Sequence, residues 1–273
     1  MVLGLCFCTV TLLCFCLLLF AAHVSFLPAL LISAAVFLLL HLLFVVFFWL
    51  VSLPVPTDRP LERRHPFICW GVANGISVLN FYFGVRPQFT GLEKIPTDGR
   101  FLYVCNHRSA FDPIIIMDRL RRFEISFISK PANMKIPMIG RVAYAAGYLG
   151  IDRENDRNAL RTILTAADYM KRDICSVGIY PEGTRSKTNE LLPFHSGSLK
   201  AAQKAKVPIV VACCHGSEKI KRLKIISGTK VYLDILETIP AETVCAMKTT
   251  DLSNHIVDMI QQDLNRTEGT ETA

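Results

Sequence analysis

The first 57 residues contain no Asp, Glu, Lys or Arg, and this charge-free leader constrains the fold more than any other feature of the sequence. All 53 charged side chains, 30 basic and 23 acidic, therefore lie in the remaining 216 residues. That density is about one residue in four, the usual proportion for a globular domain. The chain thus joins an apolar leader to one ordinary domain. This excludes intrinsic disorder, a fibrous repeat and a protein that lies mostly within a membrane.

The leader divides into two apolar stretches. Residues 2–22 are almost all Leu, Phe, Val and Cys, and as a helix they would span roughly 31 Å, close to the hydrocarbon thickness of a bilayer. Polar residues and a proline interrupt the run between positions 23 and 28, before a second apolar stretch at 29–53. A cleaved signal peptide fits less well, because no basic residue precedes the apolar core and a second segment follows at once. We therefore predict two helices in a membrane.

Basic residues follow this hairpin directly. Arg59, Arg63 and Arg64 flank the second apolar stretch, which favours the cytoplasmic side of a cytoplasmic membrane for this flank and for the domain after it. The pattern leaves open whether the hairpin spans the bilayer or dips into one leaflet. It predicts a membrane anchor at 1–57 and a single domain at 58–273.

The domain alternates short apolar runs with helical stretches. Strands are expected at residues 101–105, 125–129, 175–180, 208–213 and 230–236. Helices are expected at residues 158–171, 198–205 and 253–264, and at 67–83, where the charge-free sequence suits either an interfacial or a core helix. Such alternation is typical of an α/β fold with a central, mostly parallel sheet flanked by helices. Chemistry in such sheets collects in the loops that follow the strands.

The excess of basic residues, a formal net charge of +7, suits an anionic partner such as phospholipid, a phosphorylated substrate, an acidic carrier protein or nucleic acid. The one local cluster consists of Lys219, Lys221, Arg222 and Lys224 and has no interleaved aromatic residues, so nucleic acid is not expected. The cluster fits anionic lipid, an acidic acyl carrier protein or a solvated face. Four of the ten cysteines lie in the apolar leader; the other six lack paired metal spacing and are expected to be reduced, and no metal site is predicted.

The loop after residues 101–105 contains His107 and, five positions later, Asp112. One turn of chain could bring the two side chains into hydrogen-bond range. The carboxylate would then hold the imidazole in one tautomer and stabilise its protonated form, which makes the histidine a general base. Taken alone, the pair is weak evidence and favours a structural histidine.

The loop after residues 175–180 has the sequence Pro-Glu-Gly-Thr-Arg-Ser at 181–186. Its Pro and Gly favour a tight turn, and the planar guanidinium of Arg185 suits a phosphate. Glu182 could orient that arginine or bind a hydroxyl group, or the two could form only a local ion pair. Two further basic residues follow apolar segments, Lys130 and Arg153.

The His107–Asp112 loop, the segments with Lys130 and Arg153, and the 181–186 loop resemble, in this order and spacing, the motifs of the glycerolipid acyltransferase superfamily. The resemblance is strongest to the 1-acyl-sn-glycerol-3-phosphate acyltransferases. The resemblance covers about residues 87–236, implies that the domain at 58–273 is an acyltransferase domain, and also suits the hydrophobic anchor. It implies that His107 and Asp112 form a catalytic base and its orienting carboxylate. It also implies a substrate-binding set, which comprises Lys130, Arg153, Glu182, Gly183, Thr184 and Arg185. The chain departs from the family after the third motif, where His195 replaces a usual lysine and is expected to be a surface residue.

The resemblance implies acyl transfer from an acyl-CoA or acyl carrier protein thioester to the sn-2 hydroxyl of lysophosphatidic acid, which gives phosphatidic acid. No cofactor or metal is expected, and the membrane lipid is itself a partner, because acceptor and product reside in the bilayer. Glycerol-3-phosphate, another lysophospholipid or a lysolipid with an amino-acid headgroup are alternative acceptors. A non-catalytic, membrane-anchored lipid-binding module is a further alternative.

Overall fold

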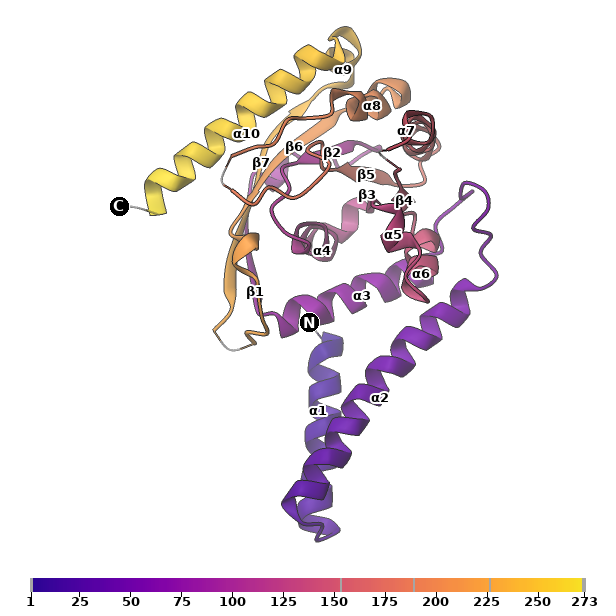
Figure 1. The fold of residues 1–273 in the computed structure, drawn as a ribbon, viewed down its shortest axis with the longest axis vertical. Coiled ribbons are helices and arrows are strands. Elements are labelled where there is room, and N and C mark those ends of the chain that lie inside the picture. Colours follow the sequence, from indigo (N-terminus) through magenta and orange to yellow (C-terminus); the bar gives the residue numbers. More distant parts are fainter. Residues whose placement is uncertain (1, 153, 189, 226, 272–273) are drawn as a thin grey trace.

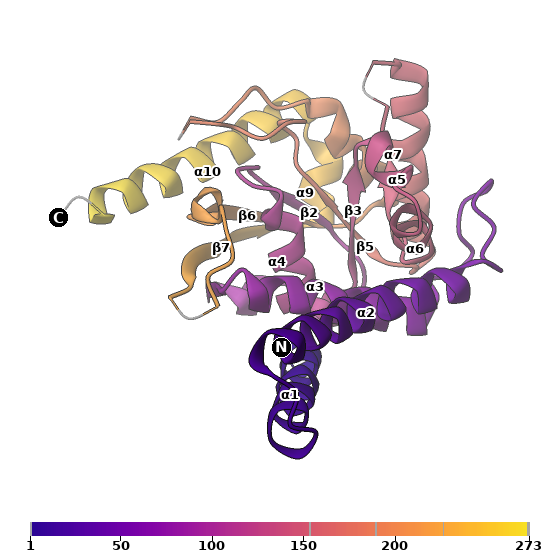
Figure 2. The ribbon, with the colours of Figure 1, turned by 60° about the horizontal axis from the view of Figure 1, so that its bottom comes forward.

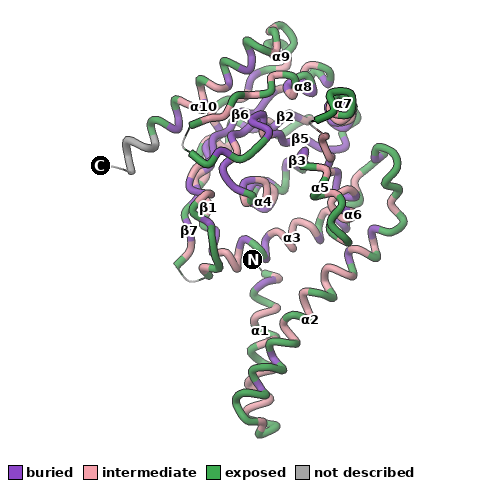
Figure 3. Tube along the Cα trace, in the orientation of Figure 1, coloured by how far each residue is buried: buried purple, intermediate pink, exposed green. Residues whose placement is uncertain are grey.

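The computed structural model describes residues 2–152, 154–188, 190–225 and 227–271, with side chains up to residue 266. The leader forms two helices, α1 (Val2–Cys16), which a π-helical turn extends through Leu17–Ala21, and α2 (Phe26–Ser52). Each is long and apolar enough to cross a membrane, and only 6% of either apolar window is buried in the protein. Figure 3 shows the pair projecting away from the domain with largely exposed surfaces. Such an apolar surface is stable only against lipid or another apolar partner.

A third helix, α3 (Pro66–Tyr82), connects the anchor to the domain and matches the helix expected at residues 67–83. One face is buried against the domain, including Ile68 and Asn80, whereas Phe67 and Trp70 are exposed on the other. The helix therefore packs on the domain, as a core helix would, and also presents exposed apolar side chains on its outer face, as an interfacial helix would.

The domain contains a seven-stranded sheet in the order β1-β7-β6-β2-β5-β3-β4. Every neighbouring pair is parallel except β6 and β7, so the predicted mostly parallel sheet is confirmed. The strands are β1 (Val85–Thr90), β2 (Leu102–Cys105), β3 (Ile125–Ser129), β4 (Leu149–Gly150), β5 (Ser176–Ile179), β6 (Ile209–His215) and β7 (Thr229–Ile239).

Helices cover both faces of this sheet, as Figures 1 and 2 show. The helices of the domain after α3 are α4 (Phe111–Arg119), α5 (Pro131–Met134), α6 (Ile139–Ala145), α7 (Asp156–Lys171), α8 (Lys200–Ala205), α9 (Ala241–Ala246) and α10 (Thr249–Glu271). On one face, Val104 of β2 and Val211 of β6 share a core with α7, α8 and α10. On the other face, Tyr103 and Ala212 pack with residues of α4. The predicted α/β fold with flanking helices is thus confirmed, as three layers with an apolar core on each face of the sheet.

All five expected strands are present, but two strands and several helices were not predicted. Strand β1 contains Pro87, which an edge strand tolerates because its outer side needs no ladder hydrogen bond. Strand β4 has only two residues, too few for a periodic signal. Strand β7 is longer than expected because it pairs with β1 on one side and with β6 on the other. Helix α10 likewise extends well beyond the expected 253–264.

Candidate active site

The loops singled out in the sequence converge at one edge of the sheet. Strands β2, β5, β3 and β4 are consecutive neighbours and all parallel, so their carboxyl ends meet at the same edge. The loop with His107 follows β2, the loop at 181–186 follows β5, and Lys130 follows β3. Adjacent strands lie about 4.8 Å apart, so the ends of β2 and β3 are separated by roughly 10 Å. One phosphorylated small molecule could reach all three loops.

His107 and Asp112 form a hydrogen-bonded pair. Nδ1 of the imidazole lies 2.8 Å from Oδ2 of Asp112. The same oxygen accepts the main-chain N–H groups of Arg108, at 2.7 Å, and Ser109, at 2.8 Å. Because a carboxylate only accepts hydrogen bonds, Nδ1 carries the hydrogen and the lone pair resides on Nε2. This is the tautomer that a general base requires.

Asp112 is fully buried, and its position explains how the fold tolerates a carboxylate there. It occupies the first turn of α4, where the helix dipole favours negative charge. Its three N–H donors compensate for the lost water. On the other oxygen, the thiol of Cys214 lies 3.8 Å from Oδ1. The sequence did not predict α4, because Pro113 follows so soon, but a proline is tolerated in the first turn of a helix.

Two aromatic rings support the imidazole. The ring of Tyr180, the last residue before the 181–186 loop, stacks on His107 with centroids 4.1 Å apart and planes at 17°. Phe127 of β3 stacks on Tyr180 in turn, with centroids 5.4 Å apart and planes at 13°. The His107 side chain therefore has its plane set by packing and its direction set by Asp112. Sequence reasoning missed Tyr180 and Phe127, since both read there as ordinary apolar strand residues.

The 181–186 loop holds the main chain of His107 on both sides. Oε1 of Glu182 accepts the N–H of His107 at 2.6 Å, and the N–H of Ser186 donates to the His107 carbonyl oxygen at 2.8 Å. Oε2 of Glu182 accepts the N–H of Leu192 at 3.0 Å. Burial raises the pKa of the Glu182 carboxyl, although its two N–H donors counteract part of that rise. Both carboxylate oxygens thus face the backbone, and Glu182 is placed to position His107.

The remaining predicted binding residues differ in exposure. Gly183 is buried and has φ of +72°, a left-handed conformation that a side chain would strain. Thr184 and Arg185 are exposed in the same loop, between the two contacts to His107. Lys130 is exposed just before α5. Arg153 lies outside the described residues.

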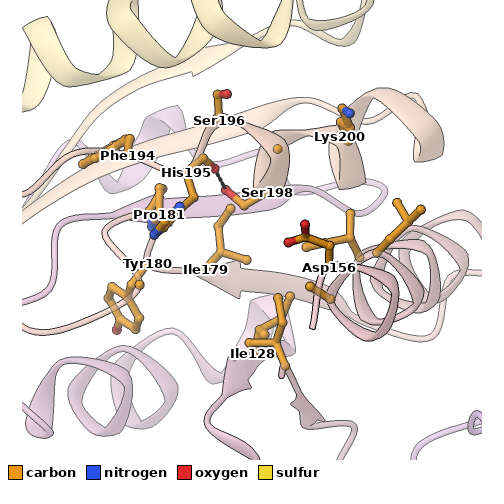
Figure 4. Close-up of a pocket in the computed structure, with 16 residues that line it drawn as sticks. Ile128, Asp156, Ile179, Tyr180, Pro181, Phe194, His195, Ser196, Ser198 and Lys200 are labelled. Carbon is orange, nitrogen blue, oxygen red and sulfur yellow. Dashed lines mark hydrogen bonds between the residues drawn. The ribbon is translucent and has the colours of Figure 1, made fainter. Parts of the chain in front are cut away.

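A cavity of about 620 Å³ opens beside this site, within the usual range for ligand pockets. The 181–186 loop contributes Pro181 and Gly183 to its wall, Tyr180 just before the loop also lines it, and His195 lies next to Pro181 (Figure 4). His195 is exposed, as expected, and its N–H donates to the Pro181 carbonyl oxygen at 2.9 Å. The other walls are mostly apolar and include Ile128, Ile151, Leu160, Ile163, Ile179 and Phe194. The cavity therefore suits a ligand with an apolar portion.

The buried cysteines near the pair are poor nucleophiles. Burial, together with the negative charge of Asp112, raises the pKa values of the Cys105 and Cys214 thiols well above the usual range. Cys214 is also fixed by Asn106, whose side chain bonds its N–H at 2.7 Å and its carbonyl oxygen at 2.9 Å. Asn106 joins the ends of β2 and β6 and so helps to fix the start of the loop that carries His107. All ten cysteines are free, in line with the expected reduced thiols.

A histidine base held by a buried carboxylate suits acyl transfer to a hydroxyl group, and comparison with known proteins points to the same class of enzyme. The sequence profile of the Acyltransferase family matches residues 86–215. Residues 86–215 thus resemble the Acyltransferase family, and with the relatives described next they identify the chain as an acyltransferase.

Its relatives make the similarity more specific. The chain is 27% identical over 209 residues to the 1-acyl-sn-glycerol-3-phosphate acyltransferase of Haemophilus influenzae, which covers 74% of this chain and 87% of that protein. It is 26% identical over 196 residues to the Escherichia coli protein of the same name, covering 69% and 80%. A solved acyltransferase from Thermotoga maritima has the same fold, with a TM-score of 0.60, 22% identity, and coverage of 84% of this chain and 95% of that one. The apolar helices and these relatives indicate a membrane-associated enzyme.

Proposed function

We propose that the protein transfers a fatty acyl group from a thioester to the free sn-2 hydroxyl of 1-acyl-glycerol-3-phosphate, which yields phosphatidic acid. The observation that carries this proposal is the His107–Asp112 pair, with Nε2 available as the base, in a loop held against the one that bears Arg185. The names of the relatives support the acceptor. Coenzyme A or an acyl carrier protein would supply the thioester.

In the proposed reaction, Nε2 of His107 removes the hydroxyl proton while the oxygen attacks the thioester carbonyl carbon. Asp112 stabilises the imidazolium that forms. The tetrahedral intermediate then collapses, the carbon–sulfur bond breaks, and the imidazolium protonates the departing thiolate. Lys130, Arg153 and Arg185 would bind the acceptor phosphate and so convert binding energy into orientation. The mostly apolar cavity beside the 181–186 loop would accept an apolar portion of a substrate. The mechanism uses no cofactor.

The anchor would hold the acyltransferase domain at the membrane surface. Lysophosphatidic acid and phosphatidic acid carry acyl chains that reside in the bilayer, so the domain must work at its surface. Arg59 and Arg63, next to the second anchor helix, favour the cytoplasmic face of the membrane.

The decisive experiment is an acyl-transfer assay with purified full-length protein, lysophosphatidic acid and each thioester donor. His107→Ala should lower turnover by roughly 10²–10⁴-fold, the usual contribution of a general base. His255→Ala is the matched control and should retain activity, because that histidine is exposed on α10 and does not line the cavity. Near-normal turnover in His107→Ala would contradict the general-base role. Glycerol-3-phosphate or lysophosphatidylcholine outperforming lysophosphatidic acid would contradict the acceptor.

A further inference from the structure

We infer that the connection between β6 and β7 is a second membrane contact, one that binds anionic phospholipid headgroups and inserts two apolar side chains into the bilayer interface. Its central part, residues 219–225, is here called the basic loop. The inference extends the proposed function, on which it rests for the placement of the enzyme at a membrane. It concerns a surface that takes no part in the proposed chemistry.

The sequence of the basic loop is unusually one-sided in charge. Five cations occur between positions 219 and 230, and no carboxylate occurs from 219 to 233. Within the described part of the chain, no ion pair involves Lys221, Arg222 or Lys224. A cluster of this kind attracts an anionic membrane surface.

Exposed apolar side chains alternate with these cations. Leu223 is 64% exposed and Ile225 is 49% exposed. Exposure of large apolar side chains to water is unfavourable in free energy. At a bilayer, the same side chains can enter the boundary between headgroups and acyl chains, while the cations remain among the headgroups. An acidic protein partner would satisfy the charge alone. The apolar pair therefore favours lipid over an acyl carrier protein.

The structure fixes this loop at the base of the anchor. The N–H of Lys224 donates to the Tyr82 carbonyl oxygen, at the end of α3, at 3.2 Å. Gly84 lies in close contact with the loop, because a Cβ built on Gly84 would lie 1.9 Å from the Lys224 carbonyl oxygen. The loop thus has a fixed position relative to α3.

The end of α3 also contacts both anchor helices. Nε2 of His41, in α2, is hydrogen-bonded to the Tyr82 hydroxyl at 2.9 Å. A Cβ at Gly4, in α1, would lie 3.1 Å from the Phe81 ring. In Figures 1 and 2, the β6–β7 connection accordingly lies on the same side of the domain as the anchor. A bilayer that holds the anchor would meet the basic loop as well.

The test uses full-length protein in nanodiscs of phosphatidylcholine, in nanodiscs that also contain phosphatidylglycerol, and in uncharged detergent. Amide hydrogen exchange of residues 219–228 should be slowed by phosphatidylglycerol. Each cation near an anionic surface contributes about fivefold to binding, so K221Q/R222Q/K224Q should abolish that protection. K204Q/K206Q/K248Q removes three exposed charges around α8 and α9, far from the anchor, and should leave the protection intact.

Insertion is tested separately with a photoactivatable benzoylphenylalanine at position 223, which should crosslink to phospholipid. The same probe at Leu164, an exposed leucine of α7, should not. Equal exchange in all three environments would overturn the inference, as would protection that appears only when acyl carrier protein is added. Acyl transfer in uncharged detergent should be unchanged in K221Q/R222Q/K224Q. Loss of the loop contact and failure of the proposed function are therefore distinguishable outcomes.

Discussion

At the residue scale, Glu182 is a motif residue whose carboxylate is bonded to the backbone. Its two oxygens accept the N–H groups of His107 and Leu192, so it connects the loop that carries His107 to the chain beyond the 181–186 loop. The sequence motif suggested contact with Arg185 or with a hydroxyl group. The tertiary structure instead assigns both oxygens to the backbone, because β2 and β5 are neighbours and place the two loops side by side.

Glu182→Ala should lower kcat with little change in the KM for the acyl donor. The substitution leaves two partly or fully buried N–H groups without an acceptor, which costs about 1–3 kcal/mol, and a displacement of His107 by 1 Å can cost about 10²-fold in rate. Steady-state kinetics and thermal unfolding in detergent would measure both effects. Glu182→Gln retains one acceptor oxygen and should recover part of kcat. A rise in acceptor KM with unchanged kcat would instead indicate direct substrate binding.

Arg185→Ala should raise the KM for lysophosphatidic acid about 10- to 100-fold, the usual effect of losing a hydrogen bond to a charged group. Its side chain is exposed between the two contacts that fix the loop on His107. Monoacylglycerol, which lacks the phosphate, serves as the comparison acceptor and should be affected little. Lys187→Ala, two residues along, is the matched control. Equal losses on both acceptors would rule out a phosphate-binding role.

At the element scale, the β1–β7–β6 edge of the sheet is held by a polar cluster as well as by ladder hydrogen bonds. Asp234 of β7 is buried, accepts a hydrogen bond from the Thr90 hydroxyl of β1, and lies 3.5 Å from Nε2 of His215 in β6. Burial alone would raise the pKa of Asp234, but His215 and Thr90 outweigh it and lower the pKa below the ordinary 3.8. The Asp234 carboxylate of β7 therefore contacts side chains of both neighbouring strands, β1 and β6.

Asp234→Asn should lower the free energy of unfolding near neutral pH by roughly 1–3 kcal/mol. A lowered folded-state pKa gives stability that is present above the ordinary value of 3.8 and is lost as the pH falls through the lower, folded value. The difference in unfolding free energy between Asp234→Asn and wild type should therefore shrink as the pH falls through the folded-state pKa of Asp234. Thermal unfolding in detergent across a pH series would measure it. Asp258→Asn, on the exposed side of α10, controls for loss of charge, and a pH-independent difference would contradict the assignment.

At the scale of the whole molecule, the enzyme is an anchor and a domain joined by specific contacts. Arg141 of α6 donates to the carbonyl oxygens of Ser52, at 3.1 Å, of Leu53, and of Val55, at 2.9 Å. These carbonyls lie at the end of α2, where a helix leaves acceptors unsatisfied. The guanidinium thus fixes the direction in which the anchor leaves the domain.

Arg141→Ala should reduce transfer to long-chain lysophosphatidic acid in vesicles several-fold more than transfer to a short-chain, water-soluble analogue. The reason is that the anchor would no longer hold the site in one orientation to the bilayer. Arg141→Lys should recover only part of the loss, because lysine lacks the planar fork. Arg157→Ala, exposed on α7, is the matched control. Equal loss on both acceptors would point to a disturbed active site instead.

The sequence by itself determined the broad organisation. A leader without charge can be stable only in an apolar medium, and alternating strand and helix patterns specify a mostly parallel sheet, so the anchor and fold class were predictable. The His107–Asp112 spacing is local, and one turn of chain brings the pair together. Only the tertiary structure decided that Tyr180 supports the imidazole, that Glu182 binds backbone, and that residues 219–225 lie beside the anchor. These are contacts between segments far apart in the chain, and strand order, which no local pattern encodes, decides which of them meet.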